Sequence, residues 1–273
     1  MSNTQPQEAL EAMLQSYCKQ LRLPGIRRDY QELVRQAQQQ TIPPLRFLIN
    51  CLEHEAVDRK QRQRQARTKA AKFPQLKRFE DFDFALIPQL SRDQVLRLAQ
   101  SDYIGHRQNI LCLGPSGTGK THVAIALGHA AIEAGYRVRF IRTLTLAQEL
   151  LTAQQELRLN PYLKSWRKFD LVILDELGYL ELGPGAPLLF QFVAERYEAG
   201  SLIVTSNLDF ARWEDVFGDP ALTTALLDRL THHCHLLIFH GESHRFRQSQ
   251  QQLKQLKAEK EVNQAVDQTS QTQ

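Results

Sequence analysis

The chain has 273 residues, 42% of them hydrophobic, and a formal net charge of +4. This composition supports a buried core and excludes a disordered chain, whereas so small a net charge says little by itself about a polyanionic partner. The longest apolar runs are strand-sized, far below the ~20 residues that a membrane span needs. The N-terminus shows no secretory signal, and the four cysteines form no CxxC pair, as is usual in a reducing compartment. We therefore expect a cytoplasmic protein with no membrane partner.

Residues 1–75 are predicted to form a small all-helical domain. Between residue 6 and about residue 72, apolar residues recur at helical spacing in three segments. The turn Leu23-Pro24-Gly25 ends the first segment. Pro43-Pro44 opens the third, because proline is tolerated in the first turn of a helix.

A basic run closes this domain, since the chain carries no acidic residue from Arg59 to Arg78. One interpretation is the solvated continuation of the third helix, and the other is a surface that contacts the phosphate groups of a nucleic acid. We favour the nucleic acid, because an unbroken basic run repels itself in an ordinary surface helix. The predicted DNA-binding residues are Arg59, Lys60, Arg62, Arg64, Arg67, Lys69 and Lys72.

Residues 76–246 alternate short β-runs with amphipathic helices, which predicts an α/β domain with a parallel, doubly wound sheet. The expected strands are residues 110–113, 138–141, 171–174, 202–205 and 236–239. The last segment, residues 247–273, is rich in Gln and poor in aromatic residues, so we expect a polar, disordered tail there.

The strongest motif is GPSGTGKT at residues 114–121, which matches GxxxxGK[ST] and lies between a predicted strand and a predicted helix. In such a loop, backbone N–H groups and the helix N-terminus surround phosphate groups. We expect Lys120 to reach the β- and γ-phosphates of ATP and the Thr121 hydroxyl to bind Mg²⁺. The predicted ATP-binding residues are Gly114, Pro115, Ser116, Gly117, Thr118, Gly119, Lys120, Thr121 and His122.

Two adjacent carboxylates, Asp175 and Glu176, end an apolar run that begins at Phe169. Carboxylates at the end of a buried strand are costly unless a metal lies there. We expect Asp175 to hold Mg²⁺ together with Thr121, and Glu176 to polarise the attacking water. This second acid favours hydrolysis over phosphate transfer to a small acceptor. The sequence thus predicts an ATPase that uses ATP and Mg²⁺.

Three polar residues further along the chain complete the predicted catalytic set. Asn207 ends another apolar run. If this strand lies between the strand before the P-loop and the strand of Asp175, which we call the two phosphate-site strands, the Asn207 amide faces the γ-phosphate. The alternative is that Asn207 is an ordinary turn residue. Arg229 suits a contact from a neighbouring subunit, and Arg245, just past the final strand, suits a contact within the same subunit. Surface ion pairs are the alternative for both arginines. The predicted catalytic residues are Lys120, Glu176, Asn207, Arg229 and Arg245.

Four segments resemble the IstB-like transposition helper ATPases of the AAA+ group, a branch that also holds DnaC-type helicase loaders and the initiator DnaA. They are GPSGTGKTH, FDLVILDELGYL, ERYEAGSLIVTSN and VFGDPALTTALLDRLTHHCHLLIFHGESHR. The resemblance runs from about Leu45 to Arg245. It implies an AAA+ domain with a five-stranded parallel sheet in the order 5-1-4-3-2, so that the strand of Asn207 lies between the two phosphate-site strands.

The same resemblance implies roles and partners. Asn207 resembles the sensor-1 residue, Arg229 the arginine finger and Arg245 the sensor-2 arginine. His244 departs from the pattern, because the family more often has Tyr there. The implied partners are duplex DNA, a transposase of the IstA type and further copies of the chain in a ring or helix. The implied function is ATP-dependent selection of target DNA for a mobile element.

Two weaker signals are interpreted as structural. Three histidines and Cys234 cluster at residues 232–235, but no second pair of ligands stands at zinc-finger spacing. Phe79, Phe82 and Phe84 precede the P-loop and are predicted to be a packing clasp for the incoming chain.

Two other functions remain open. A DnaC-like replicative helicase loader shares the whole ATPase core, and its N-terminal domain should bind a helicase and prefer single strands. A small-molecule kinase is disfavoured by Glu176, by the strand of Asn207 and by the helical basic domain before the P-loop.

Overall fold

The structure, a computed structural model, describes residues 7–241 and residue 243. It divides into two compact units, Met1–Ala66 and Arg67–Gln273, and each is described by itself. Arg245 and the expected tail at residues 247–273 lie outside the described residues. No helix in the described ranges is long and apolar enough to cross a membrane.

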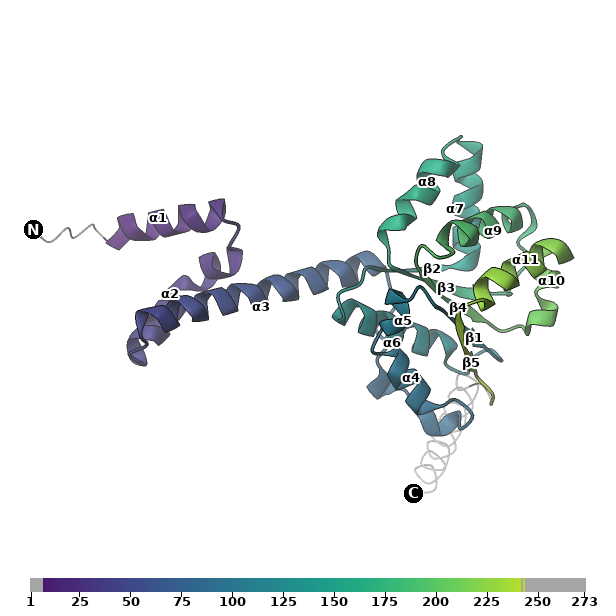
Figure 1. Ribbon diagram of the computed structural model, residues 1–273, viewed down its shortest axis with the longest axis horizontal. Helices are drawn as coiled ribbons and strands as arrows, with labels where there is room; N and C mark the ends of the chain where they lie inside the picture. The colour runs from purple at the N-terminus through teal and green to yellow at the C-terminus, as the bar shows by residue number, and fades with distance from the viewer. Residues whose placement is uncertain (1–6, 242, 244–273) are drawn as a thin grey trace, which may run out of the picture. The chain divides into compact units, whose positions relative to one another are not determined.

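The first unit is built from helices (Figure 1), as the periodicity predicts. They are α1 (Gln7–Gln20), α2 (Pro24–Gln39) and α3 (Pro44–Ala71), and the last turns of α3 belong to the second unit. The carboxylate of Glu55 accepts hydrogen bonds from the backbone N–H groups of Gly25, at 2.7 Å, and Ile26, at 3.1 Å. Glu55 thereby satisfies two of the free N–H groups at the start of α2.

The second unit contains a five-stranded parallel sheet in the order β2-β3-β4-β1-β5, which is the order 5-1-4-3-2 expected from the resemblance. The strands are β1 (Asn109–Leu113), β2 (Val138–Arg142), β3 (Leu171–Leu177), β4 (Ser201–Ser206) and β5 (Cys234–Ile238). The central strands β3 and β4 are buried on both faces, as parallel strands with helices on both sides must be.

Alternating residues of each strand face two different cores. Ile110 and Cys112 of β1 pack into one core, together with apolar residues of α6, whereas Leu111 and Leu113 pack into the other. Helices therefore cover both faces of the sheet (Figure 1). The α-helices of this unit are α4 (Arg92–Leu98), α5 (Asp102–Gly105), α6 (Lys120–Glu133), α7 (Thr143–Gln155), α8 (Leu159–Ser165), α9 (Ala186–Arg196), α10 (Glu214–Phe217) and α11 (Pro220–Thr231). Short 3-10 turns occur at Phe79–Asp81, Phe84–Leu86, Trp166–Lys168, Gly183–Gly185 and Phe210–Arg212.

The end of α3 is anchored to the second unit. Ala71 is fully buried in the core beneath α6. The guanidinium of Arg139, on β2, donates a hydrogen bond of 3.2 Å to the carbonyl oxygen of Ala70. The boundary between the two units consequently falls inside α3 and inside the basic run.

Candidate nucleotide site

The P-loop connects the carboxyl end of β1 to the start of α6, as the motif predicts. Its glycines adopt backbone angles that other residues avoid, with φ of +142° at Gly114 and +94° at Gly119. A side chain at Gly114 would also collide with the carbonyl oxygen of Phe239, and one at Gly119 with the ring of Phe82. Glycine is therefore required at both positions for conformation and for space.

Lys120 folds back across the loop. Its Nζ donates hydrogen bonds of 2.7 Å to the carbonyl oxygens of Gly114 and Pro115, and only 7% of the residue is exposed. Because α6 begins at Lys120, the free N–H groups at the helix N-terminus face the same space. A buried ammonium group and a helix N-terminus together favour a bound anion.

Asp175, on β3, is bonded to β4 and to the first turns of α6 and α7 at the carboxyl edge of the sheet. Its Oδ1 accepts hydrogen bonds from the hydroxyls of Thr121, at 2.8 Å, and Thr205, at 2.7 Å. Its backbone carbonyl accepts one of 3.0 Å from the hydroxyl of Thr143. The residue is 3% exposed, and no ion pair to its carboxylate occurs within the described residues.

This environment fits a divalent cation. A buried carboxylate without a cationic partner is costly, and oxygen atoms are the ligands that Mg²⁺ prefers. The structure brings Thr121 and Asp175 together, the two residues expected to bind the metal.

Glu176 occupies a strained position beside this site. Its φ is +62°, and the register between β3 and β4 shifts between Leu174 and Leu177. Its backbone N–H donates a hydrogen bond of 3.0 Å to the Thr205 hydroxyl, and its Oε2 lies 3.4 Å from Nε of Arg142. Left-handed backbone at such a residue costs free energy, and such strain is often found at functional sites.

Asn207 follows β4, which lies between β3 and β1 as expected. Its side-chain Oδ1 is buried and has no hydrogen-bond partner within the described part of the chain. Buried acceptors are almost always satisfied in folded proteins. This oxygen is therefore available to a group that enters the site.

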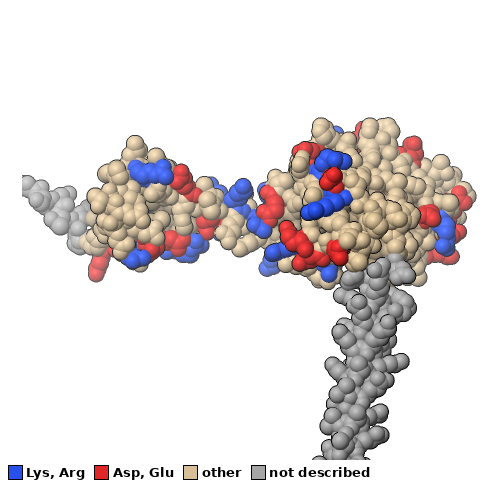
Figure 2. Space-filling view, turned by 90° about the horizontal axis from the view of Figure 1, so that it is seen from below, with Lys and Arg blue, Asp and Glu red and all other residues tan. Residues whose placement is uncertain are grey.

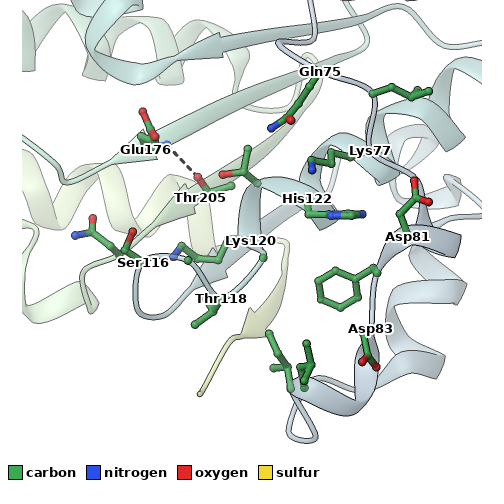
Figure 3. Close-up of a pocket in the computed structure, with 18 of the residues that line it drawn as sticks. Gln75, Lys77, Asp81, Asp83, Ser116, Thr118, Lys120, His122, Glu176 and Thr205 are labelled. Atoms are coloured by element: carbon green, nitrogen blue, oxygen red, sulfur yellow. Dashed lines mark hydrogen bonds between the residues drawn. The ribbon is translucent and has the colours of Figure 1, made fainter. Parts of the chain in front are cut away.

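A cavity of about 560 Å³ (Figure 3) is lined by Lys120, Thr121, Glu176, Thr205 and Asn207, and its volume is within the usual range for a small-molecule site. Ser116 and Tyr179 form part of the wall, and their hydroxyl oxygens are 2.7 Å apart. The opposite wall is formed by a segment before the P-loop that includes Phe82. Phe82 also packs against Phe84 and His122, with ring centroids 4.8 and 5.2 Å apart. It thus belongs to a packing clasp, as predicted, and to the cavity.

Sequence reasoning missed several residues of the site. Thr205, Tyr179 and Arg142 are each far from the P-loop in sequence. Thr205 and Tyr179 line the cavity and Arg142 contacts Glu176, because parallel strands end at one edge of the sheet. The only available signal was their place at or just after a strand.

Cys112, beneath the loop, contributes no nucleophile, because complete burial raises its pKa to about 12.

The arginine expected to act on a neighbouring subunit lies apart from the cavity. Arg229, on α11, donates a hydrogen bond of 2.7 Å to the carbonyl oxygen of Ala225, and its guanidinium lies 4.9 Å from the ring centroid of Phe190. It does not line the cavity formed by the described residues of its own chain.

Acidic residues balance part of the basic run. Arg62 pairs with Glu55 at 3.1 Å and with Asp58 at 2.7 Å, and Arg59 lies 3.6 Å from Glu55. Asp58 directly precedes the run and Glu55 lies one helical turn before it, so a search for acidic residues inside the run could not find them. On the face shown in Figure 2, basic and acidic side chains are interspersed on each unit.

Comparison with known proteins agrees with this geometry. Residues 16–252 match the family described as IstB-like ATP binding protein. The ATP-binding protein of insertion sequence IS5376 from Geobacillus stearothermophilus is 38% identical over 93% of this chain and 100% of its own length. The corresponding protein of IS21 from Pseudomonas aeruginosa is 39% identical over 86% of this chain and 89% of its own.

Among solved structures, AMPPCP-bound DnaA from Aquifex aeolicus is similar in fold, with a TM-score of 0.52 and 21% identity. The match covers 67% of this chain and 56% of the DnaA chain. The expected P-loop ATPase with an AAA+ fold is confirmed. The chain belongs to the family of IstB-like ATP-binding proteins.

Proposed function

We propose that the chain is a DNA-binding regulatory ATPase that assists a transposase in selecting target DNA for a mobile element. The observation that supports the proposal most is the joining of Thr121, Asp175 and Thr205 through one carboxylate oxygen beside the P-loop. It provides the polar site that ATP hydrolysis requires. The relatives named above belong to insertion sequences, which supports the biological context.

In this proposal the phosphates of ATP lie in the P-loop. Lys120 then exchanges its bonds to the carbonyl oxygens of Gly114 and Pro115 for bonds to phosphate oxygens. Thr121 and Asp175 would hold Mg²⁺, which neutralises charge on the phosphates. The apolar side of the cavity, at Phe82, suits the base.

Glu176 and Asn207 would act on the attacking water. Glu176 lines the cavity and accepts a proton from the water as it attacks. Asn207 Oδ1 accepts a hydrogen bond from the same water, which gives the buried oxygen the partner it lacks within the described residues. For this chemistry Glu176 must separate from Arg142.

Arg229 would complete the site of a neighbouring copy. Its distance from the cavity of its own chain supports a contact between subunits in a ring or helix. Charge that develops on the transferred phosphoryl group is stabilised by a guanidinium in this arrangement.

The basic run would bind duplex DNA through phosphate contacts, and a transposase of the IstA type would be the protein partner. A DnaC-like helicase loader remains the second candidate, because the fold is shared with a replication initiator. It differs in its expected preference for single-stranded DNA and in its need for a helicase partner.

The rate of ATP hydrolysis with and without duplex DNA, measured beside the size of the assembly, tests the proposal. We expect duplex DNA to change the rate and ATP to enlarge the assembly. Glu176→Gln is the control for background hydrolysis. A response to single strands alone, with binding to a hexameric helicase, would favour the helicase loader. No response to either form of DNA would contradict both.

A further inference from the structure

A segment before the P-loop, residues 73–87 and here called the strap, is fixed along α6. At its start, the ring of Phe73 lies 4.5 Å from the ring of His129 and leaves no room for a side chain at Gly128. Further along, the carbonyl oxygen of Arg78 lies 2.7 Å from Nε2 of His122. At the P-loop, Phe82 packs on Gly119. The strap is thus held at Phe73, Arg78 and Phe82, on both sides of Lys77.

Lys77 is the one lysine of the strap, and it lines the cavity. Figure 3 shows its side chain extending from the strap toward the cavity, beside His122. The residue is half-buried, and its ammonium group makes no hydrogen bond or ion pair to any described residue. This distinguishes it from Lys120, which is bonded to two carbonyl oxygens, and from Arg142, which pairs with Glu176.

The acidic residues near the cavity do not neutralise Lys77. Asp81 and Asp83 of the strap also line the cavity, but neither forms an ion pair with Lys77 within the described residues. The carboxylate of Asp83 instead accepts a hydrogen bond of 2.9 Å from the backbone N–H of Ala85. Partial burial of a cation without a partner costs free energy. A hydrogen bond from the Lys77 ammonium group to an anionic ligand in the cavity would offset this cost.

We propose that Lys77 is a nucleotide-binding residue that contacts the phosphates of the nucleotide held by the P-loop. The inference rests on the proposed ATP site and extends it to a second lysine from the other wall of the cavity. Lys77 lies beside His122 in Figure 3, near the point where the P-loop passes into α6, and Lys120 lines the same cavity from the P-loop. The strap therefore supplies a second cation to this cavity. The strap thereby binds the ligand as well as packing against the core.

The test measures equilibrium affinity of the full chain for AMPPCP, a non-hydrolysable ATP analogue, with Mg²⁺ present. Lys77→Met retains the apolar stem and removes the charge, whereas Lys77→Arg retains the charge. We expect Lys77→Met to weaken binding about tenfold and Lys77→Arg to restore most of it, as for a hydrogen bond to a charged group. Arg78→Met removes the adjacent, exposed cation and should leave the affinity unchanged.

The thermal unfolding curve of each nucleotide-free variant should match that of the parent chain. Unchanged affinity in Lys77→Met would overturn the inference and leave the ATP site intact. Equal weakening by Lys77→Met and Lys77→Arg would also overturn it, because shape and not charge would then be the cause. If the parent chain binds no AMPPCP, the proposed ATP site is contradicted, and the inference about Lys77, which rests on it, is contradicted as well.

Discussion

Nε of Arg142 lies 3.4 Å from Oε2 of Glu176, so a cation from the neighbouring strand engages the carboxylate proposed to activate water. The two side chains are 62% and 33% exposed, and a pair this open to solvent contributes little to stability. It can nevertheless hold the carboxylate away from the attacking water.

We expect Arg142→Ala to raise the basal rate of ATP hydrolysis about two- to fivefold, which corresponds to an exposed ion pair worth up to ~1 kcal/mol. The affinity for AMPPCP should stay unchanged. Arg137→Ala is the matched control, because it removes an exposed pair with Asp170 at the other end of β2. A lower rate in Arg142→Ala would mean that this arginine assists hydrolysis.

Lys120 and Glu176 should separate binding from turnover. Lys120→Ala removes the cation at the mouth of the P-loop, so ATP binding should be lost. Glu176→Gln should bind ATP normally and hydrolyse it at least ~100-fold more slowly, because only activation of the water is impaired. Titration with ATP and single-turnover hydrolysis measure the two effects. Hydrolysis at the normal rate by Glu176→Gln would remove Glu176 from the mechanism.

Thr205 is predicted to hold the carboxyl edge of the sheet together. Its hydroxyl donates to Asp175 and accepts from the N–H of Glu176, so Thr205→Val leaves both groups without this partner. We expect the free energy of unfolding to fall by about 1–3 kcal/mol in urea titrations, with slower hydrolysis. Thr205→Ser keeps the hydroxyl and should recover both properties. Thr224→Val, at an exposed helical site, is the control and should change neither.

Arg229 is expected to act on the site of another copy. Arg229→Ala should bind ATP normally and hydrolyse it poorly. Mixing it with Lys120→Ala should restore part of the activity, because an intact P-loop can then meet an intact Arg229 across one interface. The measurement is the hydrolysis rate at several mixing ratios. An absence of rescue at every ratio would assign Arg229 to its own subunit or to structure.

The sequence predicts those residues of the site that belong to local motifs, but not those that reach the site only through the fold. Lys120, Thr121 and the Asp175–Glu176 pair are found because their chemistry requires a local motif. The position of β4 between β3 and β1 came from family resemblance, since alternating strands and helices leave the strand order open. Thr205 and Arg142 were missed because their contacts exist only after parallel strands align.

Contacts between distant segments were also missed in the helical domain. The periodicity of the three helices was sufficient to find them, but not to show that Glu55 lies buried against the start of α2 and pairs with Arg62. Arg62 therefore has a structural role that a count of basic residues does not indicate. Its replacement would disturb the fold of the first unit as well as any contact with DNA.

The DNA surface is best tested with residues of the basic run that have no acidic partner among the described residues. Lys60, Arg67 and Lys69 meet this condition, whereas Arg59 and Arg62 do not. Contacts to phosphates release counterions, and each contributes about −0.9 to the slope of log K against log salt concentration. Changing all three residues to Gln should flatten the slope by roughly two to three units if all three touch DNA.

A control variant should remove the same charge elsewhere. Lys19, Arg46 and Arg97 are exposed and lie outside the run, so changing them to Gln lowers the net charge equally. We expect a nearly unchanged slope for this control, and an unchanged affinity for AMPPCP in both variants. Duplex affinity would be measured at several salt concentrations. Equal slopes for the parent chain and the basic-run variant would locate the DNA surface on the rest of the ATPase domain, and these residues would then be a solvated part of α3.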